Sequence, residues 1–68
     1  MIPVDSEFLS EVDYDASALV LTILFRDRSL YSYSAVPRSV FEKLMAADSH
    51  GTYFRQHIMG QYRTTQLG

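Results

Sequence analysis

Hydrophobic and polar residues alternate along the first half of the chain, in the pattern that is typical of β-strands. The alternation begins over residues 8–14, and a strongly apolar run rich in β-branched residues follows over residues 18–25. A third segment, residues 30–36, ends at Pro37, which has no amide hydrogen to donate to a strand ladder. These segments predict a three-stranded antiparallel β-meander with residues 18–25 at its centre.

The loop between the second and third predicted strands decides which way Tyr31 and Tyr33 face. A two-residue turn would pair Phe25 with Leu30, whereas a three-residue loop over residues 27–29 would pair Phe25 with Tyr31. A shift of one residue turns every side chain of the strand to the other face of the sheet. The longer loop separates polar from apolar side chains better, so we predict this loop, with both tyrosines facing the core.

The hydrophobic spacing changes to a helical period after Pro37. Apolar residues recur at spacings of one, three and four over residues 40–45, which predicts an amphipathic helix from Pro37 to about Ala47. Ser49 is a favourable N-cap residue and predicts a second helix that extends through Ile58. The expected fold is therefore α+β, with a three-stranded antiparallel β-meander followed by two α-helices packed on one of its faces.

The length and composition of the chain are those of one small domain. Its 68 residues are 47% hydrophobic, with no Cys, so a dense core and not a disulfide or thiolate site must hold it together. The first residues lack the pattern of a signal peptide, and the longest apolar run is far shorter than the roughly 20 residues of a membrane helix. We expect a cytoplasmic single domain over residues 1–68, with its core over about residues 6–63 and with residues 64–68 frayed.

The order of several short motifs resembles the KTSC domain, a module named for its occurrence at the C-terminus of some lysyl-tRNA synthetases and also found as a free-standing bacterial or phage protein. The motifs are Tyr-Asp, Leu-x-x-x-Phe, Tyr-x-Tyr, Val-Pro, and Ala-x-Ser-x-Gly-x-Tyr-Phe followed by Ile and Tyr. They comprise Tyr14, Asp15, Leu21, Phe25, Tyr31, Tyr33, Val36, Pro37, Ala47, Ser49, Gly51, Tyr53, Phe54, Ile58 and Tyr62.

The resemblance covers about residues 6–63 and implies little about chemistry. Relatives usually have Gly in the second hairpin, where this chain has Arg28 and Ser29. An association with RNA is implied by the synthetase context, but no activity and no binding residue carries over. We expect structural roles for the following motif residues: Tyr31, Tyr33, Pro37, Phe54 and Ile58.

Charge is divided unevenly between the two halves of the chain. Residues 1–36 contain six acids and two bases, whereas residues 37–68 contain four bases and two acids. A positive second half is a weak indication of an anionic partner, and an ordinary mixed surface is the favoured explanation because the bases are few. The residues that we expect to contact RNA are Lys43, Arg55, His57, Tyr62 and Arg63.

The start of the second predicted helix is a second candidate for anion binding. Ser49, His50 and Gly51 lie where unpaired amide groups and the helix dipole favour a phosphate. A capped helix start without a ligand is the ordinary alternative, since every helix has such an end.

No catalytic or metal-binding cluster is visible in the sequence. Asp48, Ser49 and His50 are the residue types of a hydrolase triad, but three consecutive residues at a helix start diverge instead of converging. His50 and His57 lie roughly 10 Å apart along a helix, so one metal ion cannot bind both. We expect no enzyme activity, cofactor or metal.

The predicted function is therefore that of a small non-catalytic binding module with RNA as a weak partner. The alternative is a protein-interaction module that acts through an exposed sheet edge or through an open sheet face bearing Val20, Leu24 and Leu30. Self-association remains open.

Overall fold

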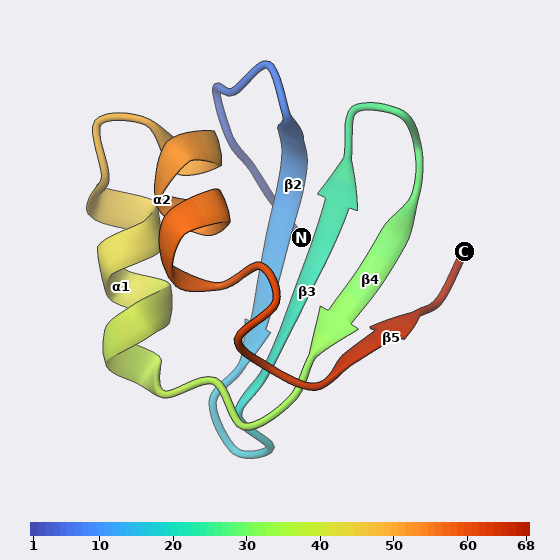
Figure 1. Ribbon diagram of the computed structural model, residues 1–68, viewed down its shortest axis with the longest axis vertical. Coiled ribbons are helices and arrows are strands. Elements are labelled where there is room, and N and C mark those ends of the chain that lie inside the picture. The colour runs from blue at the N-terminus through green and yellow to red at the C-terminus, as the bar shows by residue number, and fades with distance from the viewer.

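A five-stranded antiparallel β-sheet carries two α-helices on one of its faces in the computed structural model, which describes residues 1–68 (Figure 1). The strands follow one another across the sheet in chain order, and both helices lie between the last two strands in the sequence. The elements are β1 (Ile2–Pro3), β2 (Leu9–Asp15), β3 (Val20–Phe25), β4 (Leu30–Tyr33), α1 (Arg38–Ala46), α2 (His50–His57) and β5 (Thr64–Gln66). The α+β class is confirmed, whereas the sheet has five strands and not three.

The two additional strands come from the ends of the chain. β1 pairs with β2, and β5 pairs with β4 through Ser32 and Thr65. Beyond β5, the Leu67 amide donates to the Leu30 carbonyl at 2.7 Å, and the Leu30 amide donates to the Gly68 carbonyl at 3.1 Å. The prediction that residues 64–68 are frayed is therefore wrong. They satisfy backbone groups that β4 would otherwise expose along its edge, a role that needs no hydrophobic side chain.

The β3–β4 hairpin has a three-residue loop, as predicted, but the loop begins one residue earlier, at Arg26. The Phe25 amide donates to the Ser29 carbonyl at 2.9 Å, and the Arg28 amide donates to the Phe25 carbonyl at 3.0 Å. The Asp27 carboxylate accepts from both the amide and the hydroxyl of Ser29, at 2.9 and 2.6 Å. These bonds hold Ser29 in the ladder and leave Arg28 in the left-handed conformation, with φ of 75°.

The pairing of β3 with β4 therefore differs from the predicted one by two residues. Tyr31 lies opposite Ile23, and Tyr33 lies opposite Leu21. Because side chains alternate with a period of two, a shift of two residues keeps each side chain on the same face. The prediction that both tyrosines face the core is confirmed, with Tyr33 only 4% exposed.

Two strands are shorter than the hydrophobic pattern suggests, because residues beside them adopt left-handed conformations. β3 begins at Val20, after Leu19 with φ of 57°, and β4 ends at Tyr33, before Ala35 with φ of 57°. The Val36 amide donates to the Leu19 carbonyl at 2.9 Å, so the two turns lie against each other at one end of the sheet.

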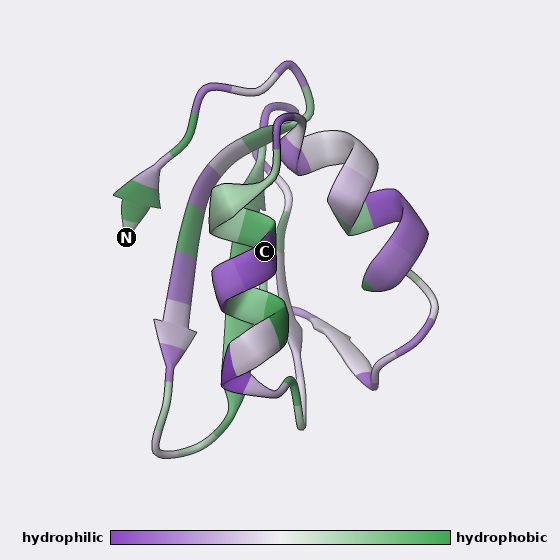
Figure 2. Ribbon diagram, turned by 90° about the vertical axis from the view of Figure 1, so that its left-hand side faces the viewer, coloured by the Kyte–Doolittle hydropathy of each residue, from purple (hydrophilic) through white to green (hydrophobic).

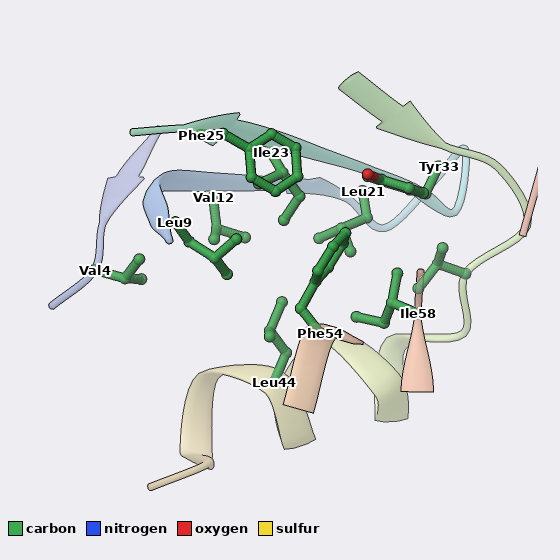
Figure 3. Close-up of a cluster of buried hydrophobic side chains, with 11 residues drawn as sticks. Val4, Leu9, Val12, Leu21, Ile23, Phe25, Tyr33, Leu44, Phe54 and Ile58 are labelled. Atoms are coloured by element: carbon green, nitrogen blue, oxygen red, sulfur yellow. The ribbon is translucent and has the colours of Figure 1, made fainter. Parts of the chain in front are cut away.

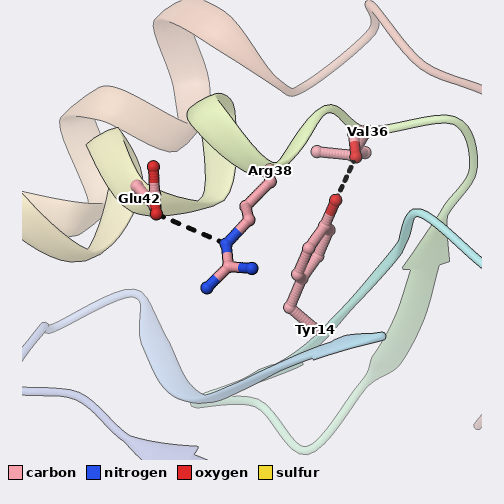
Figure 4. A network of polar contacts seen from close by, with 4 residues as sticks. All are labelled: Tyr14, Val36, Arg38 and Glu42. Atoms are coloured by element: carbon pink, nitrogen blue, oxygen red, sulfur yellow. Dashed lines mark hydrogen bonds and ion pairs between the residues drawn. The ribbon is translucent and has the colours of Figure 1, made fainter. Parts of the chain in front are cut away.

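Tyr14 joins β2 to the segment that leads into α1 (Figure 4). Its hydroxyl donates to the Val36 carbonyl at 2.6 Å, and its ring stacks on Phe41 with centroids 4.7 Å apart. The ion pair between Arg38 and Glu42, at 3.4 Å, lies on the exposed side of the same helix. An exposed pair of this kind contributes little stability, so the half-buried Tyr14 is the stronger of these two contacts.

Both helices begin close to the predicted positions. Pro37 occupies the N-cap position of α1, one residue before the first helical residue. Ser49 is the N-cap of α2, as predicted, and its hydroxyl oxygen accepts from the Thr52 amide at 3.2 Å. Gly60 follows α2 with φ of 76°, a conformation that favours glycine at the end of a helix.

Loss of the Ser49 cap should weaken α2 measurably. We expect Ser49→Ala to lower the free energy of unfolding by about 1 kcal/mol, because the Thr52 amide loses its acceptor. Ser49→Asp is the matched control and should retain the stability, since a carboxylate caps equally well and interacts favourably with the helix dipole. Urea denaturation followed by circular dichroism measures both variants. Equal losses in both would contradict the capping role.

The core lies between the sheet and the two helices (Figure 3). Phe54 is fully buried at its centre, with its ring 5.4 Å from the rings of both Phe25 and Tyr33. A bulge in β2 between Leu9 and Glu11 allows Leu9 and Val12 to point into this core together. The buried residues are Val4, Leu9, Val12, Leu21, Ile23, Phe25, Tyr33, Val36, Leu44, Phe54 and Ile58.

Candidate functional site

One continuous segment of the chain contains no acidic residue. It runs from Ser49 to Gly68 and comprises α2, the turn that follows it and β5. We call residues 49–68 the acid-free segment. Figure 2 shows the last part of α2 as strongly hydrophilic. Four of the five predicted RNA-contacting residues lie in this segment, and Lys43 lies apart from it on α1.

Arg55 is held against an aromatic ring and not against a carboxylate. Its guanidinium carbon lies 4.4 Å from the centroid of the Phe8 ring, a cation–π arrangement. The protein's one ion pair is that of Arg38 with Glu42, so Arg55 forms no direct ion pair, although three carboxylates line the hollow beside it. Phe8 in turn packs on Phe25 with centroids 4.9 Å apart. Arg55 is therefore a positioned, exposed positive charge.

The other residues of the predicted contact set have distinct environments. His57 stacks on Tyr53 with ring centroids 4.5 Å apart. Tyr62 is half-buried and packs against the core. Arg63 is exposed, while its carbonyl accepts from the Ser34 amide at 2.9 Å, which fixes the backbone before β5. The structure thus offers two arginines without ion pairs, one aromatic stack and the half-buried ring of Tyr62 along one segment.

The start of α2 is engaged in packing. A Cβ on Gly51 would lie 3.3 Å from the Phe8 Cβ, so a larger residue would require a small shift of the N-terminal loop where it crosses the helix. His50 Nδ1 lies 2.8 Å from the Leu44 carbonyl, and since a carbonyl only accepts, the proton lies on Nδ1. The Ser49 hydroxyl accepts from Thr52. Ser49 and His50 therefore form hydrogen bonds within the protein, and Gly51 packs against the N-terminal loop, so each residue of the candidate phosphate site already has a structural role.

The hollow beside this helix start has the wrong charge for an anion. It has a volume of about 640 Å³ and lies between the N-terminal loop and α2. Asp5, Glu7 and Asp48 line it, against one arginine, Arg55. Three carboxylates repel a phosphate more strongly than one guanidinium attracts it, so this arrangement weighs against the predicted anion site.

A second hollow, the aromatic groove, lies between the β3–β4 hairpin and α2. Its volume is about 260 Å³, and its lining residues are Phe8, Phe25, Asp27, Ser29, Tyr31, Tyr33, Phe54 and Met59. Sequence reasoning missed this groove, because its rings come from four separate segments that only the fold brings together.

Tyr33 contributes an unpaired hydroxyl to the aromatic groove. The hydroxyl has no hydrogen-bond partner within the protein. Because no buried polar side-chain atom lacks a partner, this oxygen must be accessible from the groove that Tyr33 lines. Figure 3 shows its oxygen turned towards Phe25. Burial, with a smaller effect of Tyr31, raises the pKa of Tyr33 to about 12, which keeps the hydroxyl protonated at neutral pH.

The surfaces of the alternative, protein-binding function are partly covered. The edges of the predicted meander are occupied by β1 and β5. β1 contains Pro3, which cannot donate to a further strand. β5 is exposed. The Arg63 carbonyl accepts from the Ser34 amide, and the Leu67 amide donates to the Leu30 carbonyl. Because the backbone groups of alternate residues point to opposite sides of a strand, those of Thr64 and Gln66 face away from the sheet. The remaining open edge is therefore that of β5.

No three histidine, aspartate or glutamate side chains lie close enough together to hold a metal ion. Neither helix has the length and apolar character needed to span a bilayer.

Comparisons with known proteins agree with the motif order. The KTSC domain profile matches residues 5–62. The chain is 36% identical over 63 residues to a lysine–tRNA ligase of Trichormus variabilis, covering 93% of this chain but only 11% of that protein. It is 31% identical over 67 residues to a protein of Tsukamurella paurometabola, all of which it covers.

A solved structure shows the same fold. The crystal structure of a KTSC domain protein from Yersinia pestis superposes with a TM-score of 0.94 at 32% sequence identity. The superposition covers 97% of this chain and 93% of that one. Profile, sequence identity and fold agree over nearly the whole length, and the chain therefore belongs to the KTSC domain family.

Proposed function

We propose that this KTSC domain is a non-catalytic module that binds single-stranded RNA weakly through the acid-free segment. The observation that carries the proposal is the pair of arginines, Arg55 and Arg63, on twenty residues without a carboxylate. Neither arginine forms an ion pair within the protein. The occurrence of a similar segment within lysine–tRNA ligases, whose name includes an RNA substrate, supports an RNA partner.

The charge distribution sets the orientation of the proposed complex. Residues 1–36 carry six of the eight acids and would repel a phosphate backbone. The strand approaches the side formed by α2 and β5, where Arg55 and Arg63 contact phosphates. Lys43 adds a contact from α1 if the strand extends that far. The His57–Tyr53 stack and Tyr62 provide ring surface for bases.

Few phosphates are contacted, so the affinity is low. Two to four neutralised phosphates correspond to a log–log salt slope of about −1.4 to −2.8 on single strands. A dissociation constant in the micromolar range or weaker follows. Such a module adds usefully to the affinity of a larger protein by raising the effective concentration of RNA near it.

The test is RNA binding by charge-matched variants. Fluorescence anisotropy with a labelled RNA of about twelve nucleotides should show binding that weakens between about 50 and 200 mM salt. The double variant Arg55→Gln with Arg63→Gln should lose most of this binding. Arg38→Glu, which changes the net charge equally but lies on α1, should retain most of it.

Two outcomes would overturn the proposal. The first is an absence of binding to the unmodified domain at low salt. The second is equal weakening in the double variant and in Arg38→Glu, which would show that only net charge matters. Circular dichroism spectra should confirm that all variants remain folded, since none of these three arginines is buried.

A second candidate function, protein binding, is favoured by the open edge of β5. The outward backbone groups of Thr64 and Gln66 can accept a strand from another protein. The half-buried residues Val20, Leu24 and Leu30 lie on the sheet face away from the helices and could extend such a contact. Binding of this kind would depend little on salt, whereas RNA binding depends strongly on it.

A further inference from the structure

We infer that the aromatic groove between the β3–β4 hairpin and α2 takes one unstacked nucleobase of the bound RNA strand. The inference rests on the proposed function and deepens it, because it assigns a base-binding site in addition to the phosphate contacts of the arginines. It concerns residues that the predicted RNA-contacting set does not include, among them Tyr31 and Tyr33.

The size and lining of the aromatic groove suit a planar ring. Its volume of about 260 Å³ exceeds the roughly 150 Å³ of an engineered cavity that holds benzene. Tyr31 packs edge-on to Phe25, with centroids 5.8 Å apart, and Tyr33 packs edge-on to Phe54 at 5.4 Å. Phe25, Tyr33 and Phe54 are largely buried, so the half-buried rings of Tyr31 and Phe8 are the ones that an inserted base would contact. Aromatic rings attract one another, and every base has a π-face to offer.

The Tyr33 hydroxyl indicates a polar occupant. Tyr33 is only 4% exposed, and its hydroxyl is unpaired. The Tyr14 hydroxyl, by contrast, donates to the Val36 carbonyl at 2.6 Å. The oxygen is accessible from the groove, so an occupant that displaces water from it loses a hydrogen bond unless the occupant supplies one. Bases carry donors and acceptors around the ring edge, whereas an aliphatic side chain does not.

The charges at the rim of the aromatic groove favour a nucleotide over a peptide side chain. Phe8 lines both the groove and the neighbouring hollow, and the Arg55 guanidinium that lies over its ring lines the hollow, so a phosphate that follows an inserted base must pass the Phe8 ring to reach this charge. Asp27 lies on the hairpin side, where hydrogen bonds from Ser29 lower the pKa of its carboxyl and keep it an acceptor. A carboxylate accepts from the exocyclic amino group of a base.

Removal of one hydroxyl tests the inference without disturbing the core. Tyr33→Phe keeps the ring and removes only the unpaired oxygen, so the free energy of unfolding should not fall. RNA affinity should weaken about 3- to 10-fold, as expected for one hydrogen bond. Tyr14→Phe is the matched control: it removes a paired hydroxyl far from the groove and should lower stability while leaving the affinity unchanged.

A strand without bases separates this inference from the proposed function. The probes are a labelled oligoadenylate of about twelve nucleotides and an abasic ribose–phosphate strand of equal length. We expect the oligoadenylate to bind more tightly. Equal affinity for both strands, together with unchanged affinity of Tyr33→Phe, overturns the groove as a base site while leaving the phosphate contacts in place. Failure of both strands to bind overturns both proposals.

Discussion

Replacement of Phe54 by alanine is expected to lower the free energy of unfolding by about 4 kcal/mol. Its ring is fully buried and contacts the rings of Phe8, Phe25 and Tyr33, with centroids 5.4 to 5.9 Å apart. Alanine would leave a cavity at the point where α2 meets the sheet. A domain of this size has a total stability of roughly 3–10 kcal/mol, so the variant should be partly or fully unfolded at room temperature.

Two companion variants keep this prediction measurable. Phe54→Leu retains much of the volume and should cost roughly 1–2 kcal/mol, which urea denaturation can determine. Gln56→Ala, on the exposed side of the same helix, should change stability by less than about 0.5 kcal/mol. A Phe54→Leu variant as stable as Gln56→Ala would show that the core does not depend on this ring.

Tyr33→Ala is the second substitution with a large expected effect, about 3 kcal/mol of lost stability. The ring is 4% exposed and packs against Phe54, so truncation removes buried area from the same core. Ser32→Ala, at the neighbouring position on the opposite face of β4, should change the free energy of unfolding by less than about 0.5 kcal/mol. Thermal or urea unfolding of both variants tests the facing of β4.

The difference in stability loss between the neighbouring variants Ser32→Ala and Tyr33→Ala tests the facing of β4 most directly. A strand that faced the other way would make Ser32→Ala the costly change and Tyr33→Ala the mild one. Similar losses in both variants would indicate that β4 is not held in one register. Tyr33→Phe should lose no stability, so the series also separates the packing of the ring from the chemistry of its hydroxyl.

The fold supplies physical reasons for the motif around α2. Ser49 caps the helix, and Gly51 allows the N-terminal loop to pack closely on it. Three residues later Phe54 enters the core. The spacing of these residues is therefore explained by one helix start and one crossing loop. Arg55 and His57, on the same helix, are exposed and lie against the rings of Phe8 and Tyr53.

Local patterns determined much of this protein before any tertiary contact is considered. The alternation of apolar residues predicts the strands over residues 8–14, 18–25 and 30–36, and the helical period predicts α1. The N-cap preference of Ser49 predicts the start of α2. Each of these signals concerns residues close together in the chain, where backbone geometry and side-chain hydrogen bonds act locally.

Tertiary structure alone decided the rest. The register of the hairpin depends on which residue of the loop adopts φ of 75°, and the Asp27–Ser29 bonds assign it to Arg28. β5 has an exposed, polar sequence and forms because β4 offers unpaired backbone groups. The aromatic groove combines rings from residues far apart in the chain. Pairing partners and enclosed spaces are properties of segments brought together in space, so no periodicity within one segment can specify them.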